Sequence, residues 1–375
     1  KKKNHPSAKN LFYNILNIEP NNEDANLNLA LVFFDEKNYD KTLLYLNKVI
    51  EINKNNLTAI YHKGLVYFFI KDLKLAIKFF EICINLNKNF MYSYLNLGHI
   101  YLRSKQFEKA LDYYKKVLEI EPNHNTSKFN ISLCYFGLND FHNGYKYYEF
   151  RKEKMQPKEK TLEVQNKYKC SEWLGESLNG KKILIITEQG IGDNIQYFRY
   201  LFMLEEKFKV KVIFYVSKKL LHLFKNSPFE IVSNLNRIND VDYYQHLMSL
   251  PGIFYKEKKK FGKCINYIKP ENNNDLKWKK KLNSLKRPII GLNWQGDKNY
   301  LSDDTRSVSL SLFKNILNYK NCTFISLQKG FGSEQIKLYN FSNSIVDLSN
   351  DIDLSDSAFE DTISILKNID LLITS

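Results

Sequence analysis

The stretch ILIITEQGIGDNIQYFRYL, residues 183–201, decides how the second half of this chain folds. Its four apolar residues at 183–186 predict a buried strand, and the segment that follows the loop has the pattern of a helix. Gly190 and Gly192 lie between them, beside the carboxylate of Asp193. A loop of this kind at a helix start offers backbone N–H groups to an anion, whereas the carboxylate is suited to chemistry of its own.

Beyond this stretch, short apolar runs alternate with amphipathic segments as far as residue 375. Because strands that alternate with helices pair in parallel, this order predicts an α/β region of two Rossmann-like halves with a cleft between them. The predicted strands are 182–187, 210–216, 229–233, 288–294, 322–328, 344–348 and 369–374, and the predicted helices are 193–206, 217–226, 310–318 and 359–368.

The first 150 residues repeat with a period of 34 residues. Small residues recur where two helices must approach closely, namely Ala8, Thr42, Ala76, Ala110 and Gly144 in one column and Ala30, Gly64, Gly98 and Ser132 in another. This helix-turn-helix period resembles the tetratricopeptide repeat, which stacks into a solenoid whose concave side binds a protein or an extended segment. A second interpretation stays open, in which the repeats only cap or dimerise the downstream domain.

The composition changes along the chain, and these changes predict its domain boundaries. A charged and polar stretch with Pro157 follows the repeats, and a weak stretch with Asn272-Asn273-Asn274 divides the two β-α halves. The predicted segments are helical repeats at 1–150, a connector at 151–180, a first Rossmann-like domain at 181–270, a linker at 271–287 and a second Rossmann-like domain at 288–375.

The chain has a formal net charge of +15 and a pI near 9.2. Lysine is spread over the whole length with abundant asparagine and isoleucine, so we interpret the charge as a solvated surface and expect no nucleic-acid partner. The five cysteines form no close pair and no metal-ligand spacing, which predicts reduced thiols, no metal site and a cytoplasmic location. No apolar run approaches the roughly 20 residues of a membrane-spanning helix.

The glycines after the first predicted strand do not match a dinucleotide-binding fingerprint. The third glycine is missing near Gln196, and the carboxylate of Asp193 would repel a pyrophosphate. No acidic residue closes the next strand to hold a ribose, and the lysine of a P-loop is absent. The sequence therefore does not favour NAD as a cofactor.

In the second half, polar residues and glycines follow the predicted strands, at the edge where open α/β sheets bind ligands. Arg306 and Lys329 are suited to neutralise a diphosphate, and an arginine can bond two oxygens at once. Alternative interpretations are a surface lysine in a turn for Lys329 and a packing role for Trp294. The residues in question are Trp294 and Gly296, then Arg306 and Ser307, then Gln328, Lys329 and Gly330.

Four motifs in this order resemble the bacterial tetratricopeptide-repeat glycosyltransferases, relatives of heptosyltransferases and of O-GlcNAc transferase. They are Glu188-Gln189-Gly190-x-Gly192-Asp193, Gly291-Leu292-x-Trp294-x-Gly296, Arg306-Ser307-x-x-Leu310 and Ser326-Leu327-Gln328-Lys329-Gly330. The resemblance covers nearly the whole chain. It implies a GT-B fold and transfer of a sugar from a nucleotide-diphosphate donor to a protein or glycan acceptor, with no further cofactor.

The resemblance also implies roles for single residues. Asp193 matches the catalytic base, which takes the proton of the acceptor hydroxyl, and its neighbours from Glu188 to Gly192 form the acceptor loop. From position alone, Asp193 fits a helix cap equally well. Arg306 matches a contact to the donor diphosphate, and Gln328 and Lys329 match contacts to phosphate or ribose.

The chain lacks an initiator Met and stops at Ser375, where the family's next donor motif would begin. We therefore expect a fragment that transfers sugar poorly or not at all by itself. A competing hypothesis is a binding scaffold, in which the repeats recruit a partner and the glycosyltransferase-like domain is inactive. His222 and His246 lie in apolar surroundings and are expected to be core or edge residues.

Overall fold

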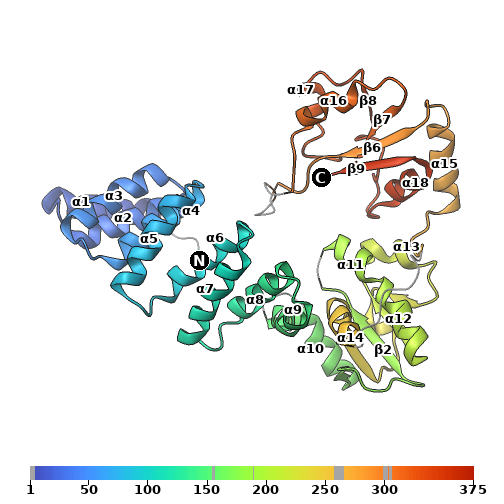
Figure 1. Ribbon diagram of the computed structural model, residues 1–375, viewed down its shortest axis with the longest axis horizontal. Coiled ribbons are helices and arrows are strands. Elements are labelled where there is room, and N and C mark those ends of the chain that lie inside the picture. Colours follow the sequence, from blue (N-terminus) through green and yellow to red (C-terminus); the bar gives the residue numbers. More distant parts are fainter. Residues whose placement is uncertain (1–4, 154–156, 189, 257–265, 299–302, 304–305) are drawn as a thin grey trace. The chain divides into compact units, whose positions relative to one another are not determined.

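The computed structural model describes residues 5–153, 157–188, 190–256, 266–298, 303 and 306–375. The chain divides into two compact units (Figure 1). The first holds the residues up to Lys158 together with Pro251–Lys258, and the second holds Glu159–Leu250 and Lys259–Ser375.

The first unit is a stack of antiparallel helix pairs, as the period of 34 residues predicts (Figure 1). The helices that carry the second column of small residues are α2 (Glu23–Asp35), α4 (Leu57–Phe69), α6 (Met91–Arg103) and α8 (Asn125–Gly137). They alternate with α1 (His5–Ile18), α3 (Tyr39–Ile52), α5 (Leu73–Leu86), α7 (Phe107–Ile120) and α9 (Phe141–Tyr148). Each pair buries one apolar face against the next pair, so neighbouring repeats share a core.

The small residues lie at close helix crossings, as predicted. A Cβ atom added at Gly64 would lie 2.8 Å from the ring of Phe80, and one added at Gly98 would lie 2.6 Å from the ring of Tyr114. Both rings are fully buried. A larger residue at either glycine would therefore force two packed helices apart.

The turn inside each repeat uses the same backbone conformation every 34 residues. A residue with positive φ lies between the two helices of each pair, and a polar residue at the start of the second helix follows it. Asn38, Asp72 and Asp140 accept the N–H of the residue three positions on, which satisfies one of the free donors of the helix start. The positive-φ residues are Lys37, Lys71, Lys105 and Asn139.

The second unit contains a five-stranded and a four-stranded sheet, and all described strand pairs are parallel. The first sheet has the order β1-β5-β2-β3-β4, with β1 (Ser171–Glu172), β2 (Lys182–Ile186), β3 (Lys211–Tyr215), β4 (Glu230–Val232) and β5 (Tyr243–His246). The second sheet has the order β8-β7-β6-β9, with β6 (Ile289–Asn293), β7 (Thr323–Ser326), β8 (Ile345–Asp347) and β9 (Leu371–Thr374).

Each sheet has a point where the strand order reverses. In the first sheet β2 pairs with β3 on one side and with β5 on the other, and in the second sheet β6 lies between β7 and β9. The loops after β2 and β6 leave these points at the carboxyl ends of the strands. Open α/β sheets bind ligands at such points.

The predicted strands are all present, but several helices and strands were missed. The connector 151–180 contains α10 (Pro157–Tyr168) and β1, and β5 was not predicted at all. The stretch 271–287 was expected to be a linker and contains α15 (Asn272–Leu282). Trp278 and Leu282 of this helix, four residues apart, are buried and pack in the core of the second sheet. The helix was not predicted because it is rich in lysine and its apolar face is narrow.

Other helices are shorter than predicted or are divided. The expected helix at 193–206 is divided into α11 (Ile191–Tyr197) and α12 (Arg199–Phe208). Phe198, between them, lies in a buried aromatic cluster with Phe214 and Phe224. The helix expected at 217–226 is a short turn followed by α13 (Leu221–Phe224). The remaining described helices are α14 (Leu250–Lys256), α16 (Lys314–Leu317), α17 (Gln335–Leu338) and α18 (Glu360–Asn368).

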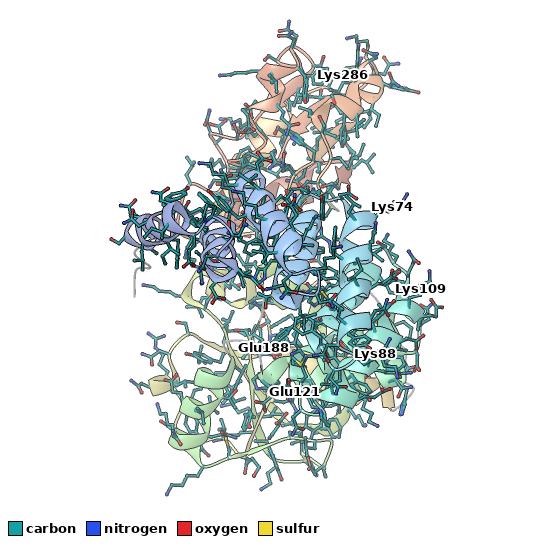
Figure 2. All side chains as sticks on the ribbon, turned by 90° about the vertical axis from the view of Figure 1, so that its left-hand side faces the viewer. Lys74, Lys88, Lys109, Glu121, Glu188 and Lys286 are labelled. Atoms are coloured by element: carbon teal, nitrogen blue, oxygen red, sulfur yellow. The ribbon has the colours of Figure 1, made fainter. Side chains whose placement is uncertain are left out.

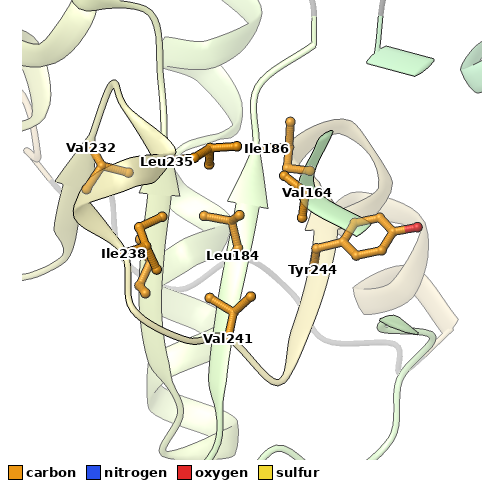
Figure 3. Packing of buried hydrophobic residues seen from close by; sticks show 9 residues of the cluster. Val164, Leu184, Ile186, Val232, Leu235, Ile238, Val241 and Tyr244 are labelled. Atoms are coloured by element: carbon orange, nitrogen blue, oxygen red, sulfur yellow. The ribbon is translucent and has the colours of Figure 1, made fainter. Parts of the chain in front are cut away.

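One face of the first sheet is covered by α10. Val164 of this helix packs with Leu184 and Ile186 of β2 and with Tyr244 of β5 (Figure 3). Gln165 donates a hydrogen bond to the hydroxyl of Tyr244 at 2.7 Å. The helix directly before the first sheet is therefore part of that sheet's core.

Candidate functional site

The loop after β2 is held by the helix that it begins. Gly190 is the N-cap of α11 with extended backbone, and Asp193 is the third residue of the helix. The N–H of Gly190 donates a hydrogen bond back to the Asp193 carboxylate, whose Oδ2 lies 3.6 Å from the position of a Cβ added at Gly190. Asp193 is therefore not the N-cap residue, but it stabilises the first turn from inside the helix.

Asp193 combines this contact with a raised pKa. Burial raises the pKa of its half-buried carboxyl above the ordinary value, and the hydrogen bond from Gly190 opposes this shift only in part. A Cβ added at Gly192 would meet no atom within 4 Å, so the space beside the first turn of α11 is open. A carboxylate with a raised pKa beside open space can accept a proton from a ligand hydroxyl.

Glu188, predicted for the acceptor loop, has its side chain buried below the loop. Its Oε2 accepts the N–H of Met248 at 3.2 Å, and its Oε1 lies 3.6 Å from Nδ1 of His246. Both side chains are almost completely shielded from solvent. His246 is buried as expected, but it lies at the carboxyl end of β5, beside the loop. Gln189 lies outside the described residues.

In the second sheet, Gln328 connects the loops after β6 and β7. Its Oε1 accepts the N–H groups of Trp294 and Gln295 at 3.3 and 3.0 Å. Its Nε2 donates to the carbonyl groups of Gln295 and Phe331 at 3.1 and 2.8 Å. The amide of Gln328 thus holds the two loops together, and this role differs from the predicted contact to a donor.

Trp294 is completely buried, and its Nε1 donates to the carbonyl of Gly332 at 3.1 Å. Trp294 therefore packs in the core beside β6, and its predicted contact to a donor stays a prediction. Its position fixes the start of the loop after β6, where Gly296 follows two residues later.

Gly296 lies against the predicted diphosphate contact. Its N–H donates to Oγ of Ser307 at 2.9 Å, and that hydroxyl donates to Asp303 at 2.6 Å. The same Asp303 carboxylate lies 3.4 Å from Nε of Arg306. A Cβ added at Gly296 would lie 2.7 Å from Nη2 of Arg306, so only a glycine lets the guanidinium lie on the loop backbone. The guanidinium is about half exposed.

Lys329 points to a different part of the second sheet. Its ammonium group donates to the backbone carbonyl of Asp353, and Gly330 follows with φ of +69°. The positive φ explains the glycine, since a residue with a side chain is strained there. The structure therefore brings Trp294, Gly296, Arg306, Ser307 and Gln328 together, and Lys329 diverges from them.

Asp303 and Gln295 are parts of this site that the sequence analysis did not single out. Asp303 stands three residues before Arg306, a spacing at which an acidic and a basic side chain can pair, so a signal was present. Gln295 gave no such signal. Its side chain accepts a hydrogen bond from Gln335 at 2.8 Å, a contact between residues 40 positions apart.

The basic charge is spread over the surface. Lys74 of α5, Lys88 of the turn after α5 and Lys109 of α7 have exposed side chains (Figure 2). Several other lysines lie against aromatic rings, such as Lys63 over Phe79 at 4.8 Å. In the described part of the chain, no group of three metal-ligating side chains and no helix able to span a membrane was found.

Family models of the tetratricopeptide repeat match residues 23–56, 57–90 and 92–124. No curated protein matches the chain. A crystal structure of MamA is similar at 25% identity and a TM-score of 0.38, over 44% of this chain and 87% of that one. MamA from Desulfovibrio magneticus RS-1 is similar at 19% identity and a TM-score of 0.37, over 40% and 84% of the two chains.

YrrB, described as a TPR protein with an unusual peptide-binding site, is similar at 17% identity and a TM-score of 0.36, over 44% of this chain and 84% of that one. The family models and the helix spacing agree in period and in register. Residues 23–124 are therefore tetratricopeptide repeats, a class of structure that presents extended surfaces to protein partners.

Proposed function

We propose that this chain is part of a glycosyltransferase that transfers a sugar from a nucleotide-diphosphate donor to an acceptor hydroxyl. Asp193 is the general base, and the repeats bind the acceptor or a protein partner. The observation that carries the proposal is the state of Asp193, a half-buried carboxyl with a raised pKa in the first turn of α11, directly after the loop that follows β2. A base that must take a proton near neutral pH is helped by such a shift.

The second sheet supports the donor side of the proposal. Arg306 lies on the backbone of Gly296, beside the carboxyl end of β6, with its guanidinium about half exposed. Asp303 fixes one side of the guanidinium, and Ser307 fixes the loop below it. An arginine held in this way suits a diphosphate, because its planar group can bond two phosphate oxygens and stabilise the leaving group.

Binding of nucleotide sugars by calorimetry tests the donor site in the natural full-length protein. We expect one donor of a panel to bind, and Arg306→Gln to weaken it about tenfold or more, since a charge-assisted bidentate contact contributes about 1.4 kcal/mol or more. Arg287→Gln is the matched control, because Arg287 pairs with Asp370 at the start of β6, the opposite end of this sheet. An equal loss in both variants would count against the assignment of Arg306.

A second candidate function is a binding scaffold with an inactive α/β part. Two observations favour it: Trp294 is buried, and the amide of Gln328 forms its hydrogen bonds with backbone groups of the loops. In a scaffold, no nucleotide sugar would bind, and partner binding would be retained when the donor-side residues are replaced.

A further inference from the structure

Three side chains from separate segments, two of them buried and one partly buried, form an array below the loop after β2. Nε2 of His246 lies 3.1 Å from the hydroxyl of Thr161, and Nδ1 of the same ring lies 3.6 Å from Oε1 of Glu188. Thr161 is in α10, His246 ends β5 and Glu188 follows β2. The imidazole thus stands between a helix on the face of the sheet and the loop that leads to Asp193.

The array lies at the point where the strand order of the first sheet reverses. β2 and β5 are paired in register, with Ile186 opposite His246, so their two following loops leave the sheet side by side. The second carboxylate oxygen of Glu188 accepts the N–H of Met248 from the loop after β5. The last residue of β5 thus faces Glu188 with a ring nitrogen, and the chain after β5 contacts it through a backbone N–H.

The distances favour a proton on Nδ1 of the imidazole. A separation of 3.6 Å is longer than a hydrogen bond, and a bare Nδ1 would be repelled by a buried carboxylate at that distance. A proton on Nδ1 removes this repulsion and gives an attraction. In the neutral ring, Nε2 then accepts a hydrogen bond from the hydroxyl of Thr161.

We propose that His246 is a positioning residue, whose imidazole holds the Glu188 carboxylate and thereby fixes the loop that carries Gly190 and Asp193. Gly190 follows Glu188 by two residues and donates the hydrogen bond that orients the Asp193 carboxylate. The inference rests on the proposed function only for the effect on catalysis, since the placement of the loop is a property of the protein without substrate.

A pair of variants separates positioning from space filling. In His246→Asn the side-chain amide reaches the place of Nδ1, so the contact to Glu188 is retained. In His246→Gln the amide reaches the place of Nε2, so the contact to Thr161 is retained and that to Glu188 is lost. Both replacements are smaller than histidine and polar, so a purely structural role predicts similar effects.

Hydrogen exchange in the natural full-length protein measures directly how well the backbone amides of this loop are protected. For the backbone amides of the peptide with Gly190 and Asp193, we expect exchange about tenfold faster in His246→Gln, as for loss of one buried charged contact. In His246→Asn we expect a change below about twofold. Equal exchange in the two variants would overturn the proposal.

A milder variant tests the same proposal if His246→Gln does not fold. Thr161→Val removes the hydroxyl and keeps the shape of the side chain, so the imidazole loses its fixed orientation. We expect the same amides to exchange about threefold faster. Exchange at the wild-type rate in this variant, with folded protein, would also overturn the proposal.

Turnover distinguishes a failure of this inference from a failure of the proposed function. With a donor substrate, His246→Gln should lower kcat about tenfold with KM unchanged, and His246→Asn should restore most of it. Absent transfer by the wild type, with the exchange pattern as expected, would refute the transferase and leave the positioning role. Transfer by the wild type with equal kcat in both variants would refute the positioning role alone.

Discussion

Different kinds of contact stabilise the repeats and the α/β unit, each within itself. In the repeats, contacts join residues of the same or the next repeat, such as Gly64 with Phe80, 16 positions apart, and Tyr61 with Asn96, 35 positions apart. In the α/β unit, contacts also join segments far apart in the sequence, as between Thr161 and His246, 85 positions apart, and between Arg287 and Asp370, 83 positions apart.

This difference has consequences for mutations. A repeat contacts only its neighbours, so a change there should alter local stability and little else. The loops of the α/β unit lie at the carboxyl ends of parallel strands, where a change can alter a ligand site without unfolding the sheet. The following predictions test this contrast.

The largest effect is expected for Phe80→Ala in the repeats. Phe80 is completely buried beside Gly64, so we expect a loss of about 3–5 kcal/mol in the free energy of unfolding of the repeats. Leu44→Ala, on the neighbouring α3 and about half exposed, should cost below about 0.5 kcal/mol. Urea unfolding followed by helical circular dichroism measures both, and similar losses would contradict the packing account.

A matched pair of glycine replacements compares the two regions directly. Gly98→Ala places a methyl group against the buried ring of Tyr114 and should cost about 1–3 kcal/mol of stability. Gly296→Ala meets the far ends of the Arg306 and Asp303 side chains rather than a buried ring, so its stability should change by less than about 1 kcal/mol.

For Gly296→Ala the expected loss is in donor affinity, about tenfold, because the guanidinium must leave the loop backbone. Thermal unfolding and calorimetry with the bound nucleotide sugar separate the two quantities. A large loss of stability in Gly296→Ala with unchanged affinity would reverse the comparison.

The protonation of Asp193 should have a smaller effect on the free energy of unfolding, and the sign of this effect follows from the raised pKa. Because burial raises its pKa, the folded protein keeps this proton to higher pH than the unfolded chain, and ionisation costs stability. Stability should fall as pH rises through the raised pKa, and Asp193→Asn should remove this loss. Unfolding of both proteins between about pH 4 and 8 should show the variant equal at low pH and more stable above.

The smallest effect is expected in the turns of the repeats. Lys71 has φ of +68°, a conformation that glycine adopts without strain, so Lys71→Gly should stabilise the repeats by about 0.5–1 kcal/mol. Lys78→Gly, inside α5, should cost about 1 kcal/mol. The two thermal shifts should have opposite signs, and a loss in both would show that the turn is not strained.

The same contrast explains what could be predicted from the sequence. The repeats have a period, so the small residues and their helix crossings were predicted before any long-range contact was known. Central strands such as β2 and β6 were predicted from continuous apolar runs. β5 was not predicted because Gln245 and His246 are polar. Both residues are buried nonetheless, and both form hydrogen bonds.

For the candidate site, the sequence placed the predicted residues in the loops after β2, β6 and β7, but it did not show which side chains contact one another. Gly296 was predicted only as a donor-side residue beyond the end of a strand, and the structure shows that the Arg306 side chain lies against it. The sequence did not predict that Glu188 is buried against the end of β5, because that contact depends on the strand order. Roles that depend on which strands are neighbours need the topology.

The most direct test of the account is the turnover of Asp193→Asn in the natural full-length protein, with the donor that binds and an acceptor. Asparagine keeps an oxygen for the N–H of Gly190 but cannot take a proton from the acceptor hydroxyl. We predict that kcat falls about 10²- to 10⁴-fold with donor affinity unchanged. Turnover equal to that of the wild type would contradict the assignment of Asp193 as the base.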